Sequence, residues 1–115
     1  MKISMSLRLC NEEGEKIFGK GVAQLLRLID KEGSLNAAAK KMGIAYSKAW
    51  KILHNAEEQL GFELVEKQSG GKNGGGSVLT PRGRSFLEKY EAFDRESGLI
   101  VEELFKKILV KGDQL

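Results

Sequence analysis

The sequence predicts a mainly α fold with small β elements, and three observations support this prediction. Apolar residues repeat at helical spacing over residues 20–32, 35–42 and 46–60, and again from residue 81 onward. The first ten residues instead alternate between apolar and polar side chains, which is typical of a half-buried strand. Five of the seven residues from Gly70 to Gly76 are glycine, which indicates a loop. A chain of 115 residues with this pattern is expected to form one domain.

The chain is expected to begin with a β-hairpin followed by a helix. The first strand is predicted over residues 3–10, the turn over residues 11–14, and the start of the return strand over residues 16–18. Helical spacing then runs from Lys20 to Glu32, and the glycine that follows is expected to cap this helix.

Two further helices form the pattern that decides the fold. Ser34 is the expected N-cap of a helix of barely two turns, which ends at Gly43. A third amphipathic helix runs from Tyr46 to Leu60, and Trp50 falls on its apolar stripe, which predicts that the indole belongs to the core. Two short helices joined by a tight turn around a glycine are typical of a helix-turn-helix.

A glycine-rich segment after the third helix predicts a wing. Residues 62–67 and 78–79 read as two strands with the glycine block between them. Thr80 as N-cap and Pro81 at the first helical position then open a long last helix, which Ser97 and Gly98 are expected to kink or break.

The predicted fold is therefore a winged helix-turn-helix with an N-terminal β-hairpin. We expect residues 1–80 to form the DNA-binding part and residues 81–115 to form a C-terminal dimerisation helix of the same structural unit.

Composition narrows the class of function. No apolar run approaches the roughly 20 residues that span a bilayer, and the N-terminus lacks the apolar core of a signal peptide. The single Cys10 and the single His54 cannot build an ordinary zinc site, and acidic pairs such as Glu57 and Glu58 are interpreted as solvated charge. We therefore expect no catalytic residue, metal or cofactor, and a cytoplasmic protein that is not an enzyme and contacts no membrane.

The net charge of +3 is unevenly distributed along the chain. Residues 20–90 hold twelve basic and seven acidic side chains, whereas residues 91–115 hold four basic and six acidic ones. The positive excess therefore coincides with the predicted helix-turn-helix and wing, which favours nucleic acid as a partner.

The polar side of the third helix is the first candidate site. Ser47, Lys48 and Lys51 lie there and suit a helix end placed in a major groove, where they would meet base edges or phosphates. The alternative is a merely solvated polar face. The glycine loop lacks the lysine of a nucleotide-binding P-loop, so we interpret it as a wing along the DNA backbone, or else as a plain hairpin tip. The full set of predicted DNA-binding residues is Ser34, Tyr46, Ser47, Lys48, Lys51, Lys67, Lys72 and Asn73.

Two segments resemble a known family. Residues 33–50 (GSLNAAAKKMGIAYSKAW) and 64–83 (LVEKQSGGKNGGGSVLTPRG) are similar to the N-terminal domain of the ModE family of molybdate-responsive transcriptional regulators, and more distantly to LysR-type winged helices. The resemblance covers residues 3 to about 109. The family tends to have serine where this chain has Ala45, and the order of Ser47 and Lys48 is reversed relative to a common lysine-first pattern.

This resemblance implies a homodimer that binds palindromic operators on double-stranded DNA in the nucleoid, through the helix after Ile44 and the glycine wing. The regulated genes would serve molybdate-type oxyanion transport or metabolism. The molybdate-binding domain of the family does not follow in this sequence, which leaves two alternatives: a stand-alone family member, or a partner chain that carries the sensor. Two alternatives remain open, namely a winged helix that docks proteins and a small oxyanion sensor that uses the glycine loop.

Overall fold

The computed structural model describes residues 1–68 and 76–111, with side chains described as far as residue 110. Two antiparallel hairpins and a set of helices make up this part of the chain, which confirms the predicted fold class. The elements in chain order are β1 (Leu9–Cys10), β2 (Lys16–Phe18), α1 (Lys20–Glu32), α2 (Leu35–Met42), α3 (Tyr46–Leu60), β3 (Val65–Gln68), β4 (Gly76–Leu79), α4 (Pro81–Phe105) and the π-helical turn η1 (Lys106–Lys111).

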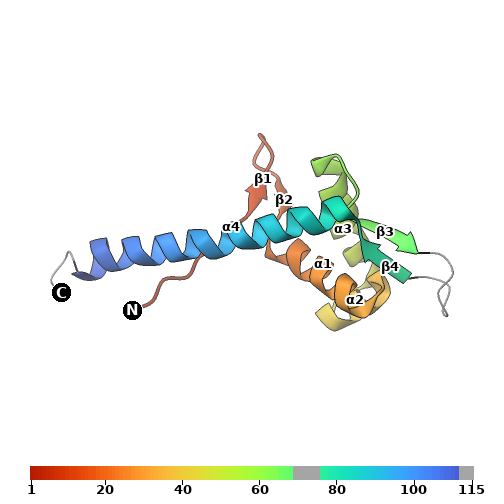
Figure 1. The fold of residues 1–115 in the computed structure, drawn as a ribbon, viewed down its shortest axis with the longest axis horizontal. Coiled ribbons are helices and arrows are strands. Elements are labelled where there is room, and N and C mark those ends of the chain that lie inside the picture. Colours follow the sequence, from red (N-terminus) through yellow and green to blue (C-terminus); the bar gives the residue numbers. More distant parts are fainter. Residues whose placement is uncertain (69–75, 112–115) are drawn as a thin grey trace.

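The molecule consists of a compact part and one projecting helix (Figure 1). Its extents are 63 × 29 × 25 Å and its radius of gyration is 17.5 Å, whereas a compact chain of this length is expected near ~13 Å. We call β1–β4, α1–α3 and α4 up to Tyr90 the head, and residues 93–110 the distal segment. The distal segment projects from the head and accounts for the elongated shape.

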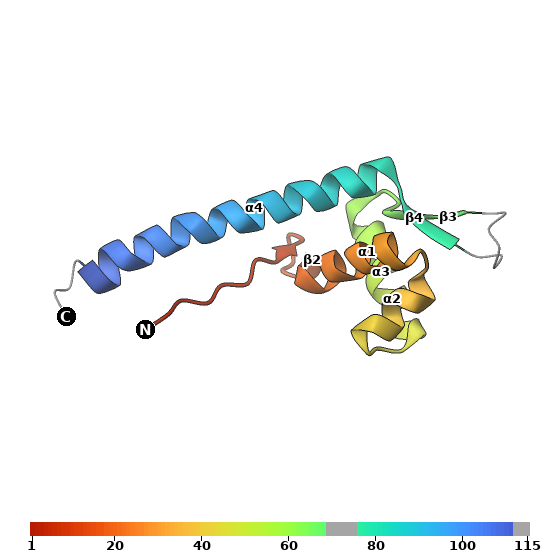
Figure 2. The same cartoon turned by 60° about the horizontal axis from the view of Figure 1, so that its bottom comes forward.

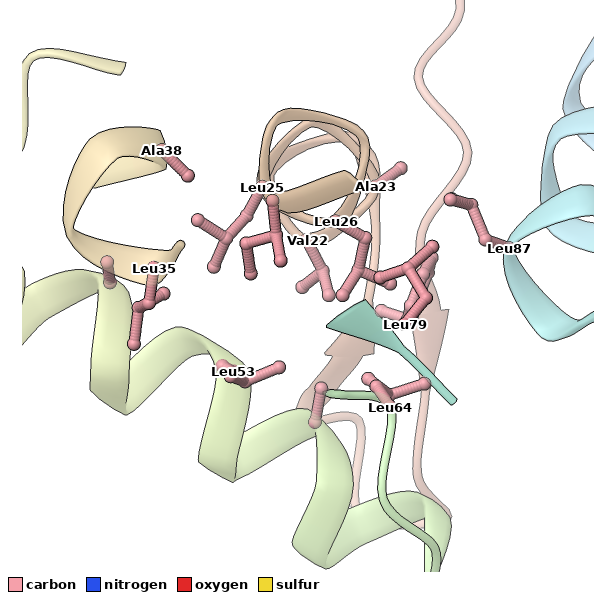
Figure 3. Packing of buried hydrophobic residues seen from close by; sticks show 14 of the residues in the cluster. Val22, Ala23, Leu25, Leu26, Leu35, Ala38, Leu53, Leu64, Leu79 and Leu87 are labelled. Atoms are coloured by element: carbon pink, nitrogen blue, oxygen red, sulfur yellow. The ribbon is translucent and has the colours of Figure 1, made fainter. Parts of the chain in front are cut away.

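The core of the head surrounds α1 (Figure 3). Leu25, Leu26 and Ile29 of α1 are fully buried, and they pack with residues of α2, α3, both hairpins and α4. Ala38 and Ala49 are also fully buried, and such small side chains let α2 and α3 lie close together.

The ends of the helices follow the predicted caps. Gly33, Gly43 and Gly61 have φ of 82°, 72° and 82°, the left-handed conformation that glycine adopts without strain. The Thr80 hydroxyl accepts a hydrogen bond from the Gly83 amide and so caps α4, with Pro81 in its first turn.

The first strand is much shorter than predicted. Pairing is confined to Leu9 and Cys10, and residues 1–8 form no strand. The apolar alternation is still visible, since Met5 and Leu7 are half-buried between exposed neighbours. These residues lie beside α4 rather than beside another strand (Figure 2), and the Tyr90 hydroxyl donates a hydrogen bond to the Leu7 carbonyl at 2.8 Å.

The predicted interruption of the last helix is wrong. α4 continues through Ser97 and Gly98 without a break. A single glycine inside a helix costs about 1 kcal/mol relative to alanine, which is too little to end a helix of 25 residues. The strand predicted from residue 62 also begins later, at Val65, because its partner β4 ends at Leu79, opposite Val65, and the chain enters α4 at Pro81. None of the described helices is long and apolar enough to cross a membrane.

Candidate nucleic-acid interface

Contacts on three sides leave one face of α3 free. Ala49, Leu53 and Ala56 point into the core. On one flank, the Asn55 amide donates to the Lys16 carbonyl of β2 at 3.5 Å. On the other flank, the Glu57 carboxylate accepts hydrogen bonds from the start of the wing. The face between these flanks is therefore the one that can meet a large partner.

The residues predicted for DNA occupy this face and its edges. Ser47, Lys48 and Lys51 are all exposed. Ser47 and Lys51 are four positions apart and so lie side by side along the helix. Within the described chain neither lysine forms an ion pair, so both ammonium groups are available to phosphates or to guanine edges.

The N-terminus of α3 has unused backbone donors. Ala45 occupies the N-cap position and offers no side-chain hydrogen bond, as its methyl group dictates. The Lys48 amide donates to the Ala45 carbonyl at 3.1 Å. The amides of Tyr46 and Ser47 remain to point outward with the positive end of the helix dipole, an arrangement that suits a phosphate oxygen. Tyr46 stands in this first turn with 49% of its surface exposed.

Ser34 has a structural role at the start of α2. Its hydroxyl oxygen accepts a hydrogen bond from the Ala37 amide at 3.1 Å, as predicted for an N-cap. A hydroxyl that accepts one bond can still donate another, so this role is compatible with a phosphate contact.

The wing is fixed firmly at its base. β3 and β4 pair in antiparallel register from Val65–Leu79 to Gln68–Gly76, the Ser77 amide donates to the Gly33 carbonyl at 2.8 Å, and the Thr80 hydroxyl donates to the Glu63 carbonyl at 2.7 Å. Lys67 is exposed on β3 opposite Ser77. The predicted wing residues Lys72 and Asn73 lie outside the described residues.

Glu57 is not the solvated charge that the sequence suggested. Its carboxylate accepts hydrogen bonds from the Leu64 amide at 2.8 Å and the Val65 amide at 3.3 Å, and it also contacts the Nδ1 atom of His54 at 2.9 Å. Because these amides lie beyond the Gly61 turn, α3 and β3 are joined by one side chain. The sequence alone gave no sign of backbone partners so far along the chain.

Trp50 is not part of the core, contrary to the prediction. Its side chain is 47% exposed, while its neighbours Ala49 and Leu53 take the core positions of the same helix. The apolar stripe places Trp50 at its edge, where a large ring extends past the core. Trp50 packs edge-to-face on His54, with ring centroids 3.9 Å apart.

Two ion pairs hold α1 against α4 behind this interface. Arg84 donates two hydrogen bonds to Asp30, at 2.6 and 3.2 Å, and lowers the pKa of that carboxyl group below its usual value. Arg27 likewise donates to Glu91 and lowers its pKa. The described residues contain no cluster of three metal-ligating side chains.

These features define a winged helix-turn-helix whose third helix has a free face with two lysines in its N-terminal half. Residues 23–84 match the family model of bacterial regulatory helix-turn-helix proteins of the lysR family, and the chain belongs to that family.

Relatives and solved structures carry the same domain. The chain is 33% identical over 85 residues to the molybdenum transport protein ModE of Azotobacter vinelandii, covering 74% of this chain and 32% of that protein. It is 39% identical over 67 residues to the DNA-binding transcriptional dual regulator ModE of Escherichia coli K12, and this match covers 58% of this chain and 26% of that protein. The chain thus spans about a third or less of these relatives. A solved CbnR_DBD-DNA complex shares the fold, with a TM-score of 0.57, 22% identity, and coverage of 72% of this chain and 90% of that one.

Proposed function

We propose that this chain is a sequence-specific, double-stranded DNA-binding regulator of transcription, which acts by binding and not by catalysis. The observation that carries the proposal is the free face of α3, where Ser47, Lys48 and Lys51 are exposed on a helix whose other sides are held by the core and both hairpins. A helix presented in this way fits the major groove, with its N-terminal residues toward the bases.

The distal segment supports a homodimer on palindromic operators. Seven of its large apolar side chains are at least 44% exposed, namely Phe93, Leu99, Ile100, Leu104, Ile108, Leu109 and Val110. Three of them, Leu104, Ile108 and Leu109, line an apolar groove of about 260 Å³ together with Ile3 of the N-terminal segment. A monomer rarely exposes such a patch, and a second copy would cover it. Two α3 helices about one DNA turn (~34 Å) apart would then read two half-sites.

The regulated genes are proposed to serve molybdate-type oxyanion transport or metabolism, in the cytoplasm at the nucleoid. Support comes from relatives whose names join molybdenum transport with transcriptional regulation.

The proposal is tested by selecting duplexes from random DNA and measuring binding to the selected sequence. Replacing both Lys48 and Lys51 with alanine should weaken binding by at least tenfold for two lost charged contacts, with thermal unfolding unchanged. The matched control replaces Lys20 and Lys89, two exposed lysines of α1 and α4 outside the distal segment, and should bind nearly as the wild type does.

Three results would contradict the proposal. No enrichment of any sequence, or binding that does not weaken with salt, would favour a protein-docking module instead. Equal binding by both double variants would place the DNA interface elsewhere. A heat of binding between the isolated chain and molybdate would favour an oxyanion sensor.

A further inference from the structure

The exposed indole of Trp50 needs an explanation. Trp50 is the only tryptophan of the chain, and nearly half of its surface is in contact with solvent. The ring lies at the edge of the free face of α3, where Tyr46 is exposed as well, so a partner that docks on this face would meet two aromatic side chains.

Its side chain is held in place by a series of contacts that reaches the wing. The ring packs on His54, His54 contacts the carboxylate of Glu57, and Glu57 accepts the amide hydrogens of Leu64 and Val65. An indole fixed in this way loses little further conformational freedom when a partner covers it, which favours affinity.

The surroundings of Trp50 match a DNA groove. Ser47 lies one turn before it on the same face, and Lys51 follows it directly. Both are exposed, and the positive charge of Lys51 is complementary to a duplex. An apolar ring beside a hydroxyl group, with an ammonium group further round the same face, is suited to the apolar feature of the major groove, which is the C5-methyl group of thymine.

We propose that Trp50 is a specificity residue that packs its exposed indole against thymine methyl groups in the major groove, with His54 and Glu57 as positioning residues. This inference rests on the DNA-binding function proposed above and adds a base preference to it.

The test compares the selected operator with the same operator in which deoxyuridine replaces each thymine of a half-site in turn. Deoxyuridine keeps the base pairing and lacks only the methyl group. For the wild type, at least one replacement should weaken binding about tenfold, in the range of one well-made base contact. For the Trp50→Ala variant, the thymine and deoxyuridine operators should bind equally, and Trp50→Phe should restore part of the difference.

A variant of His54 tests the positioning role. His54→Ala should keep the fold and most of the overall affinity, yet reduce the discrimination between thymine and deoxyuridine, because the indole is no longer braced. The fluorescence of the single tryptophan gives an independent signal. Its quenching by acrylamide should fall when the operator is added to the wild type, since the duplex covers the ring.

The outcomes separate this inference from the function on which it rests. Wild-type protein that binds no duplex would overturn both. The role of Trp50 alone would be overturned if the wild type binds specifically but Trp50→Ala discriminates thymine from deoxyuridine as strongly as the wild type does. Acrylamide quenching that the operator leaves unchanged would overturn it too. Either result leaves the DNA-binding function standing.

Discussion

The two halves of α4 differ sharply in what covers them. In the head, Leu87 is fully buried and Tyr90 is 4% exposed. In the distal segment, Ile100 is 63% exposed and Leu104 is 47% exposed, although both lie on the same helix as Leu87 and are as apolar as Leu87. One chain therefore completes the core of the head and leaves the distal segment without a partner. The comparison teaches that the core of the head is closed within one chain, whereas the described part of the distal segment keeps its apolar side chains exposed, which is why we propose that a second copy covers them.

Truncating one leucine in each region should give the largest contrast. Leu26→Ala leaves a cavity in the head and should lower the free energy of unfolding by about 2–5 kcal/mol. Leu104→Ala should leave the unfolding of dilute protein unchanged and instead weaken self-association. Chemical denaturation combined with sedimentation at several protein concentrations measures both effects. A large loss of stability for Leu104→Ala in the monomer would show that the distal segment is already covered.

The two glycines of α4 offer a second contrast. A Cβ atom added to Gly83 would lie 2.3 Å from the Leu64 carbonyl oxygen, whereas one added to Gly98 meets nothing within 4 Å. Gly83→Ala should therefore destabilise the head by about 1–3 kcal/mol, since the backbone must move. Gly98→Ala should raise the stability of the helix by up to about 1 kcal/mol. Thermal unfolding measures both, and similar effects of the two substitutions would refute the close approach at Gly83.

The uncapped start of α3 can be improved within the head. Ala45 has the extended backbone of an N-cap, with φ of −67° and ψ of 148°. Ala45→Ser should add a side-chain acceptor and raise the free energy of unfolding by about 1 kcal/mol. Ala45→Val, which cannot accept a hydrogen bond, is the control. Equal stability of the two variants would mean that these amides are already satisfied.

The ion pairs between α1 and α4 should have the smallest effect. Asp30 and Glu91 have lowered pKa values in the folded state because Arg84 and Arg27 donate hydrogen bonds to them. Their stabilisation is therefore present above the pKa of an unfolded carboxyl, about 4, and is lost as the pH falls through the lower folded pKa. Replacing both carboxylates with amides, as Asp30→Asn and Glu91→Gln, should lower the free energy of unfolding by less than about 1 kcal/mol at pH 7, since the pairs are partly exposed. The double variant should also lose less stability in acid than the wild type does, which denaturation between pH 2 and pH 7 checks.

Most of the fold was predictable because local signals agree with the tertiary structure. Gly33, Gly43 and Gly61 end three helices where their spacing implies, and Thr80 caps the fourth. Residues 3–8 were mispredicted as part of a strand because alternation reports which side chains are covered. It does not report whether a strand or a helix covers them.

The candidate site was predictable only in part. The exposure of Ser47, Lys48 and Lys51 follows from the helical period of α3. The exposure of Trp50 does not follow from that period. The period shows that Trp50 lies at the edge of the apolar stripe, but it does not show whether another helix or strand reaches far enough to cover the ring. The hydrogen bonds from the Leu64 and Val65 amides to Glu57 also could not be predicted from local sequence, since the turn at Gly61 brings these amides back to the Glu57 side chain.

The salt dependence of operator binding tests the central claim most directly. If the free face of α3 neutralises DNA phosphates through Lys48 and Lys51, the slope of log affinity against log salt concentration should fall in magnitude by about two when both are replaced with alanine. The Lys20 and Lys89 control should keep the wild-type slope. A double variant at Lys48 and Lys51 with the slope of the wild type would contradict the claim that this face of α3 binds DNA.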